Sequence, residues 1–400
     1  ALERAEIVIV QEAYRGTETA LYADVLLPAS SWGEKEGTVT NSERRISRVR
    51  AAIPAPGEAR ADWEIVVGFA RRLEQRLRPG IPGLFEYKKP EDIYNEHRES
   101  TRGRDLDITG LSYGLLEERG PQQWPFPQGA ATGKARLYED GIFPTADGRA
   151  RFVATPYRGV AENIDARYPI RLTTGRLRDQ WHGMSRTGTV ANLFAHAPEP
   201  RLALHSSDLE RCGLQIGGLA RVSSRRGTLH VMVEESSDLR PGLAHLPMHW
   251  GSRFLGGAGS AGVNGLTLAA LDPDSRQPEL KHCAVRVERA ELPWRLVAFG
   301  CASDANADEL FERLDPFMAA FPFATRVLAG KGVQLRLAAD APDAVTLLSI
   351  DRAFGLGAAD ALRYEDPTRS VGRRISLAGN RIRAVRLSGD TRSERWLHDY

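Results

Sequence analysis

Hydrophobic and polar positions follow two different patterns along the chain. In the first 80 residues, short apolar runs alternate with helical periodicity, which is typical of parallel-sheet α/β structure. Ile7–Val10 and Asp24–Leu27 are predicted strands, with a short helix at Thr17–Tyr22 between them. Asp62 precedes apolar residues spaced by three and four positions, which predicts a helix that ends near Arg78.

The pattern of apolar and polar residues changes after this helix. Residues 81–165 are rich in Gly, Pro, Gln and charge, so we expect a long connection with little regular structure. From Tyr168 onward, short β-branched runs separated by turns are typical of a β-barrel, and Arg225-Arg226-Gly227 predicts a hairpin between two of them. The predicted barrel strands include Ile170–Thr174, Leu219–Ser224, Thr228–Val233 and Lys281–Val287.

After Pro293 the pattern predicts a small α+β extension. Leu296–Phe299 is a predicted strand, and Ile375–Leu387 a hairpin that turns at Gly379-Asn380. Helices are predicted at Ala307–Met318 and Pro342–Phe354. The fold class is therefore α/β plus β-barrel, and the chain divides into an α/β part (1–80), a connection (81–165), a six-stranded, double-psi-like barrel (166–290) and the extension (294–400).

Composition excludes several classes of protein. The chain has 400 residues, 54 Lys and Arg against 52 Asp and Glu, and no apolar run long enough to span a membrane. We therefore expect no nucleic-acid partner and no membrane contact, and the cluster Arg44, Arg45, Arg48 and Arg50 is too local for a nucleic-acid groove. The 3 cysteines are dispersed singly, which predicts neither disulfides nor a metal site and fits a reducing compartment.

Two polar stretches carry candidate chemistry. Trp32–Arg45 follows a predicted strand, where open α/β sheets bind ligands, and it offers the cation of Lys35 and a close backbone approach at Gly37. Thr173–Arg176, a strand end followed by Gln180–Gly183, has the hydroxyl, glycine and guanidinium groups that bind a pyrophosphate. The alternatives are a solvated loop for the first stretch and, for His182, an ordinary hydrogen-bonding histidine.

A third stretch runs from His249-Trp250-Gly251 through a glycine-rich loop to Asn264, with Lys281 further along. Its glycines, which include Gly259, suit either a loop that lies against a ligand or a plain linker.

Together these stretches resemble the molybdopterin-dependent oxidoreductases of the dimethyl-sulfoxide-reductase superfamily. Residues 17–64, with TETALYADVLLPASSWGEKEGTVTNSERR and then PGEARADWE, resemble the last part of the molybdopterin-binding α/β domain. TTGRLRDQWHGMSRTG at 173–188 resembles the opening of the terminal dinucleotide-binding barrel, and NGLTLAALDPDSRQPELKHCAVRV at 264–287 resembles its end. Within the superfamily the chain most resembles the assimilatory nitrate reductases.

The resemblance implies a bis(molybdopterin guanine dinucleotide) molybdenum cofactor that these residues position, with Asp62 suited to a guanine N–H edge. No residue is assigned as catalytic and none as a metal ligand. The implied cofactor contacts are Gln11, Glu12, Lys35 and Asp62 from the α/β part, and Thr174, Gly175, Arg176, Leu177, Arg178, Asp179, Gln180, Trp181, His182, Gly183, Trp250, Asn264 and Lys281 from the barrel.

The resemblance also implies what surrounds this chain. We expect an internal segment of a larger cytoplasmic enzyme, inactive alone, whose absent amino-terminal part carries a [4Fe-4S] cluster and the molybdenum ligand. The implied activity is reduction of nitrate to nitrite for assimilation, with electrons from a reductase subunit, a ferredoxin or a flavodoxin. The alternatives are a formate dehydrogenase alpha subunit of the same superfamily, and a non-catalytic binding subunit that keeps the pterin fold.

Overall fold

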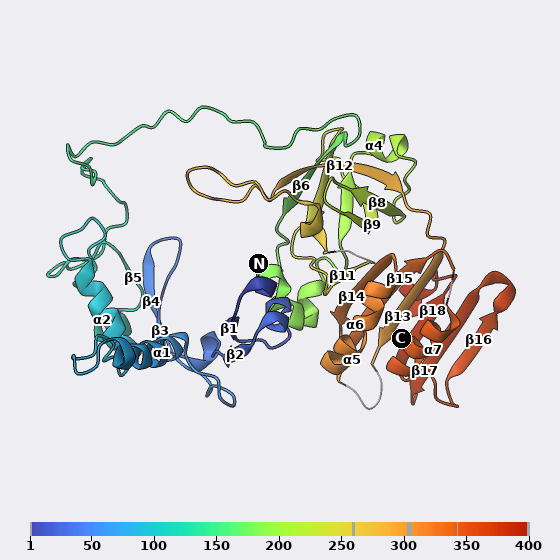
Figure 1. Cartoon of the computed structure of the whole chain (residues 1–400), viewed down its shortest axis with the longest axis horizontal. Helices are drawn as coiled ribbons and strands as arrows, with labels where there is room; N and C mark the ends of the chain where they lie inside the picture. The colour runs from blue at the N-terminus through green and yellow to red at the C-terminus, as the bar shows by residue number, and fades with distance from the viewer. Residues whose placement is uncertain (1, 258–260, 302–305, 342, 398–400) are drawn as a thin grey trace. The chain divides into compact units, whose positions relative to one another are not determined.

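The protein, represented by a computed structural model, consists of two compact units, Ala1–Tyr157 and Arg158–Tyr400 (Figure 1). The structure describes residues 2–257, 261–301, 306–341 and 343–397. Gly259 and Pro342, which belong to the predicted glycine-rich loop and the second helix of the extension, lie outside these ranges. Within them, no helix is both long and apolar enough to cross a membrane. The finer domain boundaries given above stay a prediction.

The first unit begins with a parallel pair of strands. β1 (Ile9–Glu12) lies beside β2 (Val25–Pro28), with Gln11 opposite Leu27. The pair is joined through the 3₁₀ helix η2 (Glu18–Tyr22), which replaces the short helix predicted there. The predicted long helix is confirmed as α1 (Asp62–Leu77). Because β1 and β2 are parallel, their carboxyl ends lie at one edge, and the chain returns to that edge where Ala29 bridges Arg60 just before α1.

The rest of the first unit has its own small core. The antiparallel sheet β3-β4-β5 carries the helices α2 and α3, and Ile46, Tyr94, Leu111 and Phe126 are buried between them. The expectation of little regular structure from 81 onward was therefore wrong for residues 90–100 and 113–119, which form helices that pack on β3 and on β4 respectively. The bounds are β3 (Gly37–Thr40), β4 (Arg45–Val49), α2 (Pro90–Ser100), α3 (Tyr113–Arg119) and β5 (Gln122–Gln123), with the 3₁₀ helices η1 (Leu2–Arg4) and η3 (Trp32–Glu34).

The second unit contains the predicted barrel. Six strands close in the order β10-β6-β12-β8-β9-β7, which confirms the α/β plus β-barrel class. Alternate residues of β9, such as Leu229, Val231 and Val233, point into the core, as period-two burial requires. The strands are β6 (Ile170–Gly175), β7 (Arg201–Leu204), β8 (Leu219–Ser223), β9 (Thr228–Glu235), β10 (Leu243–Pro247) and β12 (His282–Arg289), with α4 (Ser206–Arg211) between β7 and β8.

The predicted hairpin joins β8 to β9, and Ser224 N donates to Gly227 O over 2.9 Å. Gly227 is required there because a Cβ would lie 2.9 Å from the carbonyl oxygen of Gly265. Gly265 belongs to η7, so this 3₁₀ helix lies against the hairpin turn. The 3₁₀ helices of the barrel are η4 (His182–Met184), η5 (Thr187–Thr189), η6 (Ala191–Phe194) and η7 (Val263–Leu266).

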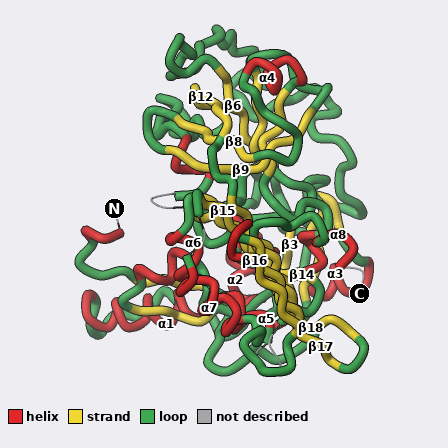
Figure 2. Tube along the Cα trace, turned by 90° about the vertical axis from the view of Figure 1, so that its right-hand side faces the viewer, coloured by secondary structure: helices red, strands yellow, loops and turns green. Residues whose placement is uncertain are grey.

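The extension supplies six strands of a seven-stranded sheet in the order β11-β14-β15-β13-β18-β17-β16, and β11 comes from the barrel segment. Figures 1 and 2 both show this sheet below the barrel. α5 packs on β14 and β15, and α6 packs on β14 and β11. The elements are β11 (Leu255–Gly256), β13 (Trp294–Gly300), α5 (Ala307–Arg313), α6 (Asp315–Ala320), β14 (Phe323–Ala329), β15 (Gly332–Ala339), α7 (Ala344–Ala353), β16 (Leu362–Asp366), η8 (Pro367–Arg369), β17 (Val371–Ala378), β18 (Arg381–Ser388) and α8 (Glu394–Leu397).

Barrel and extension share one hydrophobic core, which runs from Leu172 and Val231 to Leu296 and Leu335. The predicted hairpin is confirmed, with Gly379 at φ +61° in the turn. The single helix predicted from Ala307 is instead two helices, because Pro316 cannot donate an amide hydrogen bond to a continuing helix.

Candidate cofactor site

The first cluster lies at the shared edge of β1, β2 and α1. Gln11 comes from the carboxyl end of β1, Lys35 follows η3, and Asp62 is the first residue of α1. Gln11 Nε2 donates to Asp62 Oδ1 over 2.6 Å, and Lys35 Nζ donates to Asp62 Oδ2 over 2.5 Å. Three residues predicted from separate stretches of sequence are thus in direct contact.

The charge state of this cluster is fixed by its hydrogen bonds. Burial alone would raise the pKa of the Asp62 carboxyl, but the hydrogen bonds from Lys35 and Gln11 and the charge of Lys35 outweigh it and lower the pKa. Asp62 is therefore an anion at neutral pH, and it is still half exposed. The cluster offers a ligand one carboxylate acceptor beside an ammonium and an amide.

Glu12 is not part of this cluster. Its carboxylate accepts the backbone amides of Ala13 over 2.7 Å and Tyr14 over 3.3 Å, so it closes the turn after β1. Because the Glu12 carboxylate already binds neighbouring backbone amides, the structure weakens the prediction that it contacts a ligand.

The second cluster lies at one end of the barrel. β6 and β10 are parallel with Gly175 beside Pro247, and β12 begins at the same end with His282 opposite Thr173. Thr174 Oγ1 donates to Leu280 O over 2.9 Å, which ties the segment before Lys281 to β6. The barrel topology therefore brings Thr174, Gly175 and Lys281 to one end of the barrel.

The hairpin turn and η7 lie at this end as well. β8 runs antiparallel to β12, with Ser223 opposite Arg286, so the β8–β9 turn is at the end where β12 begins. Arg226 Nε in that turn donates to Leu266 O of η7 over 3.0 Å. Asn264, the second residue of η7, is therefore brought to the same end of the barrel.

The loop after β6 carries three positive-φ residues in succession, His182 at φ +47°, Gly183 at φ +62° and Met184 at φ +64°. This strained backbone is unusual for a histidine, and no atom lies within 4 Å of where a Cβ on Gly183 would be. Arg176 stacks over the ring of Trp181 with 4.9 Å between the guanidinium carbon and the ring centroid. The loop thus has open space beside Gly183 and a cation held over an exposed indole.

His249 is a residue that the sequence did not single out as a contact. Met248 N donates to Gly175 O over 2.8 Å, which brings the segment of His249 to the start of the loop after β6. Burial lowers the pKa of the His249 imidazole, and the charges of Arg176 and His182 lower it further. His249 has φ +88°, and its Nε2 is buried without a hydrogen-bond partner in the described structure. The adjacent Trp250 is 1% exposed, and its Nε1 also lacks a partner there.

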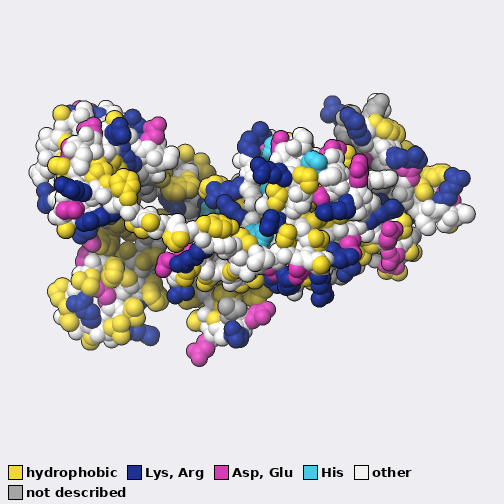
Figure 3. Space-filling view, turned by 90° about the horizontal axis from the view of Figure 1, so that it is seen from above, with side chains coloured by type: hydrophobic (Ala, Val, Ile, Leu, Met, Phe, Trp, Pro, Cys, Tyr) yellow, Lys and Arg dark blue, Asp and Glu magenta, His cyan; other side chains and the backbone are white. Residues whose placement is uncertain are grey.

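Buried polar atoms without partners are rare in folded proteins and mark places where another group completes the hydrogen bonding. Here two such atoms belong to His249 and Trp250, which follow β10 at the end of the barrel that carries Gly175 and also receives Lys281. Figure 3 shows Lys and Arg side chains beside His side chains near the middle of the face that it draws. This donor set fits an anionic dinucleotide that accepts hydrogen bonds from guanidinium, imidazole and indole groups.

Other predicted contacts have structural partners of their own. Gln180 is buried, and its side chain bonds Leu193 O over 3.1 Å and Thr187 Oγ1 over 2.7 Å, so it supports the loop from inside. Arg178 and Asp179 pair with each other over 2.7 Å, and Leu177 packs against the hydrophobic core. These four residues shape the loop that Arg176 and Gly183 occupy.

No group of three or more His, Cys, Asp and Glu side chains in the described ranges could hold a metal ion. Cys212 and Cys283 are free thiols.

The two segments that carry the clusters each match a known family. Residues 170–284 match the Molydopterin dinucleotide binding domain, and residues 1–72 match the Molybdopterin oxidoreductase family. The first match covers the barrel, and the second covers β1, β2 and most of α1. The expected class of cofactor, a molybdopterin dinucleotide, is thereby confirmed.

Curated relatives agree with these matches. A nitrate reductase of Synechocystis sp. is 42% identical over 291 residues, 72% of this chain and 40% of its own length. An F420-dependent formate dehydrogenase subunit alpha of Methanocaldococcus jannaschii is 37% identical over 289 residues, 72% of this chain and 40% of its own length. The assimilatory nitrate reductase catalytic subunit of Bacillus subtilis is 36% identical over 273 residues, 68% of this chain and 36% of its own length.

The chain thus spans 36–40% of the length of these relatives. Both matched regions occur in the predicted order, on the predicted α/β and barrel structures. Residues 1–72 and 170–284 of the chain thus belong to two molybdopterin families, the Molybdopterin oxidoreductase family and the Molydopterin dinucleotide binding domain.

Proposed function

We propose that this chain is part of a molybdenum-dependent nitrate reductase, in which its two clusters hold molybdopterin guanine dinucleotide. The observation that carries the proposal is the likeness to a nitrate reductase at 42% identity over 291 residues. The likeness extends through the barrel whose end carries the Arg176–His182–His249 group.

The residues of the chain bind and orient the cofactor. Arg176 and Lys281 would neutralise pyrophosphate charge, and Gly183 would let backbone approach it closely. Neutral His249 and the indole N–H of Trp250 would form hydrogen bonds with the cofactor through Nε2 and Nε1, the two atoms that lack partners in the described structure.

The Asp62 cluster suits a guanine edge. A carboxylate accepts from the adjacent N–H groups of guanine, while the ammonium of Lys35 donates to its carbonyl oxygen. The hydrogen bonds from Lys35 and Gln11 keep Asp62 ionised for this role.

When bound, the cofactor's molybdenum supplies the two-electron chemistry by which nitrate loses an oxygen atom and becomes nitrite. We propose that the electrons pass through a [4Fe-4S] centre of the whole protein from a reductase subunit, a ferredoxin or a flavodoxin. We propose a cytoplasmic setting, which agrees with the free thiols of Cys212 and Cys283.

A second candidate is formate oxidation, because a formate dehydrogenase alpha subunit is 37% identical over 289 residues. The test is viologen-linked activity of the full-length, molybdenum-loaded protein with nitrate and with formate. We expect nitrate reduction alone. Formate oxidation alone would replace the substrate assignment, and activity with neither in a verified holoprotein would favour a non-catalytic subunit.

A further inference from the structure

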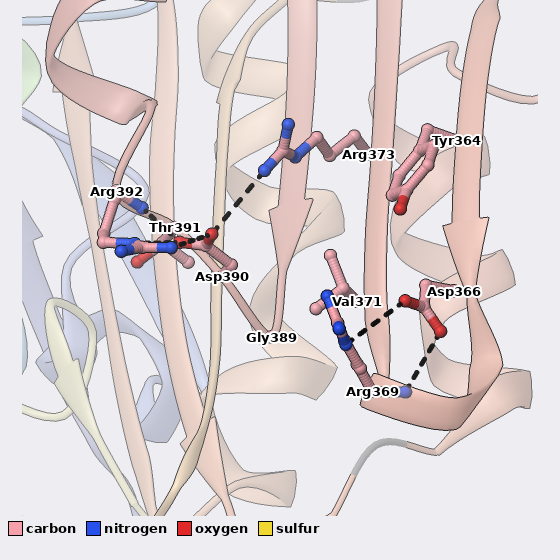
Figure 4. A pocket seen from close by; sticks show the side chains of 9 residues that line it. All are labelled: Tyr364, Asp366, Arg369, Val371, Arg373, Gly389, Asp390, Thr391 and Arg392. Carbon is pink, nitrogen blue, oxygen red and sulfur yellow. Dashed lines mark hydrogen bonds and ion pairs between the residues drawn. The ribbon is translucent and has the colours of Figure 1, made fainter.

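The extension contains a pocket that the cofactor site does not use. It has a volume of about 570 Å³ and lies where the end of β16, η8, β17 and the end of β18 meet. Figure 4 shows Arg373 and Tyr364 on one side, Asp390 and Arg392 on another, and Arg369 with Asp366 below them. The volume is within the range of small-molecule sites.

The pocket carries a surplus of positive charge. Three guanidinium groups, from Arg369, Arg373 and Arg392, line it together with two carboxylates. Asp390 receives Arg392 Nε and Nη2, each over 2.9 Å, and lies 3.6 Å from Arg373 Nη2. One carboxylate therefore already has a full bidentate partner, and Arg373 adds a second cation to it.

The remaining arginine donors are not used up within the pocket. Arg373 Nε is buried without a hydrogen-bond partner among the described residues. Arg369 Nε is 3.8 Å from Asp366 Oδ2, which is beyond hydrogen-bond distance, and its side chain is 81% exposed. Arg369 thus retains exposed donors for an incoming anion, and Arg373 Nη2, 3.6 Å from Asp390 Oδ2, is likewise beyond hydrogen-bond distance of that carboxylate.

The pocket also has an aromatic wall and a shaped floor. Tyr364 is 53% exposed, and its ring centroid is 5.8 Å from the Arg373 guanidinium carbon, so much of the ring is open. Gly389 has φ +76°, and a Cβ there would lie 2.4 Å from the Ser370 carbonyl oxygen. Only glycine lets the chain after β18 pass so close to the turn after η8.

Guanidinium forks bind phosphate oxygens, and an exposed tyrosine ring stacks on a planar base. We propose that this pocket binds a mononucleotide, with its phosphate between Arg369 and Arg373 and its base against Tyr364. The proposal concerns the extension alone and stands apart from the molybdenum chemistry.

The test is titration calorimetry of the 400-residue chain with AMP, ribose 5-phosphate and adenosine. We expect AMP to bind at least tenfold more tightly than either fragment, because it alone engages the arginines and the ring. Arg369→Gln and Arg373→Gln should each weaken AMP binding roughly ten- to hundredfold. Tyr364→Val, which keeps a strand-forming residue, should weaken AMP about tenfold and leave ribose 5-phosphate unchanged.

Arg381→Gln is the matched control, because Arg381 is an exposed arginine of β18 that does not line the pocket. Thermal unfolding should show the same midpoint for all four variants. The proposal is overturned if AMP gives no saturable binding or if the pocket variants bind it like the control. Equal affinity for AMP and ribose 5-phosphate would also overturn it, because the base would then contribute nothing.

Discussion

Lys35 and Asp62, 27 residues apart, meet with their charged atoms 2.5 Å from each other. The contact joins the loop after β2 to the first turn of α1, at the edge where parallel strands end. It thereby fixes a carboxylate at the place where open α/β folds bind ligands.

Asp62→Asn is predicted to weaken retention of the dinucleotide by about tenfold, because a charged acceptor is lost. Lys35→Met should have an effect of similar size through the lost ammonium. The measurement is guanine nucleotide per chain after gel filtration of the full-length holoprotein. Arg76→Gln, at the far end of the same helix, is the control, and equal losses in this control would count against the role of Asp62.

Arg176→Gln is predicted to raise the pKa of His249. Burial is the larger cause of the low pKa, and the substitution does not change it. The substitution does remove one of the two positive charges that lower the pKa further. The measurement is an NMR titration of the chain with labelled histidine. Arg178→Gln should leave the His249 titration unchanged, because Arg178 is paired with Asp179. An unchanged pKa in Arg176→Gln would show that the two side chains are not neighbours.

Glu162 fastens the segment before the barrel to β12 and the hairpin turn. The hydrogen bond from Arg226 first, then those from Ala284 N and Arg225, outweigh burial and lower the pKa of Glu162 to about 2 from 4.5. A carboxyl whose pKa is lower in the folded than in the unfolded state stabilises the fold at pH values above its unfolded-state pKa. This stabilisation is lost as the pH falls through the folded-state pKa. The ionised carboxylate should therefore contribute on the order of 3 kcal/mol at neutral pH.

Glu162→Gln should accordingly lower the free energy of unfolding at pH 7 but differ little from the unsubstituted chain near pH 2. Urea unfolding at several pH values measures this difference. The exposed Asp274→Asn variant should show no such loss. A pH-independent effect of Glu162→Gln would rule out ionisation as the cause.

Asp351→Asn is predicted to destabilise the extension by roughly 3–5 kcal/mol. Asp351 and Arg386 are each 1% exposed, and Arg386 Nε donates to Asp351 Oδ1 over 3.0 Å. The change removes the buried counter-charge of this guanidinium and leaves it the half-exposed Glu365 carboxylate, 3.2 Å from Nη2. Thermal unfolding measures the loss. Asp360→Asn, an exposed carboxylate nearby in sequence, should change stability little, and parity between the two variants would contradict the prediction.

The sequence predicts elements well where one local signal decides them. Asp62 followed by apolar residues at helical spacing is α1, and Gly379-Asn380 is the turn between β17 and β18. Prediction from the sequence fails where tertiary packing decides whether a segment becomes helical. Residues 90–100 and 113–119 become helical because Tyr94 and Leu116 have a core to enter, which no local pattern reveals.

The candidate site shows the same division. Lys35, Arg176 and Lys281 are predictable from residue type and motif. His249 is not, because its signal is a buried, unpartnered Nε2 on a backbone at φ +88°, and both properties exist only in the folded chain. Glu12 and Gln180 illustrate the opposite case. The sequence predicts them as cofactor contacts, but in the folded chain their side chains form hydrogen bonds within the protein.

The most direct test of the account is the guanine nucleotide and molybdenum content of the full-length protein, purified under conditions that load the cofactor. We predict a pair of guanine nucleotides for each molybdenum, and a loss of both in the combined Lys35→Met and Arg176→Gln variant that stays folded. A folded full-length protein that carries neither molybdenum nor guanine nucleotide would contradict the account.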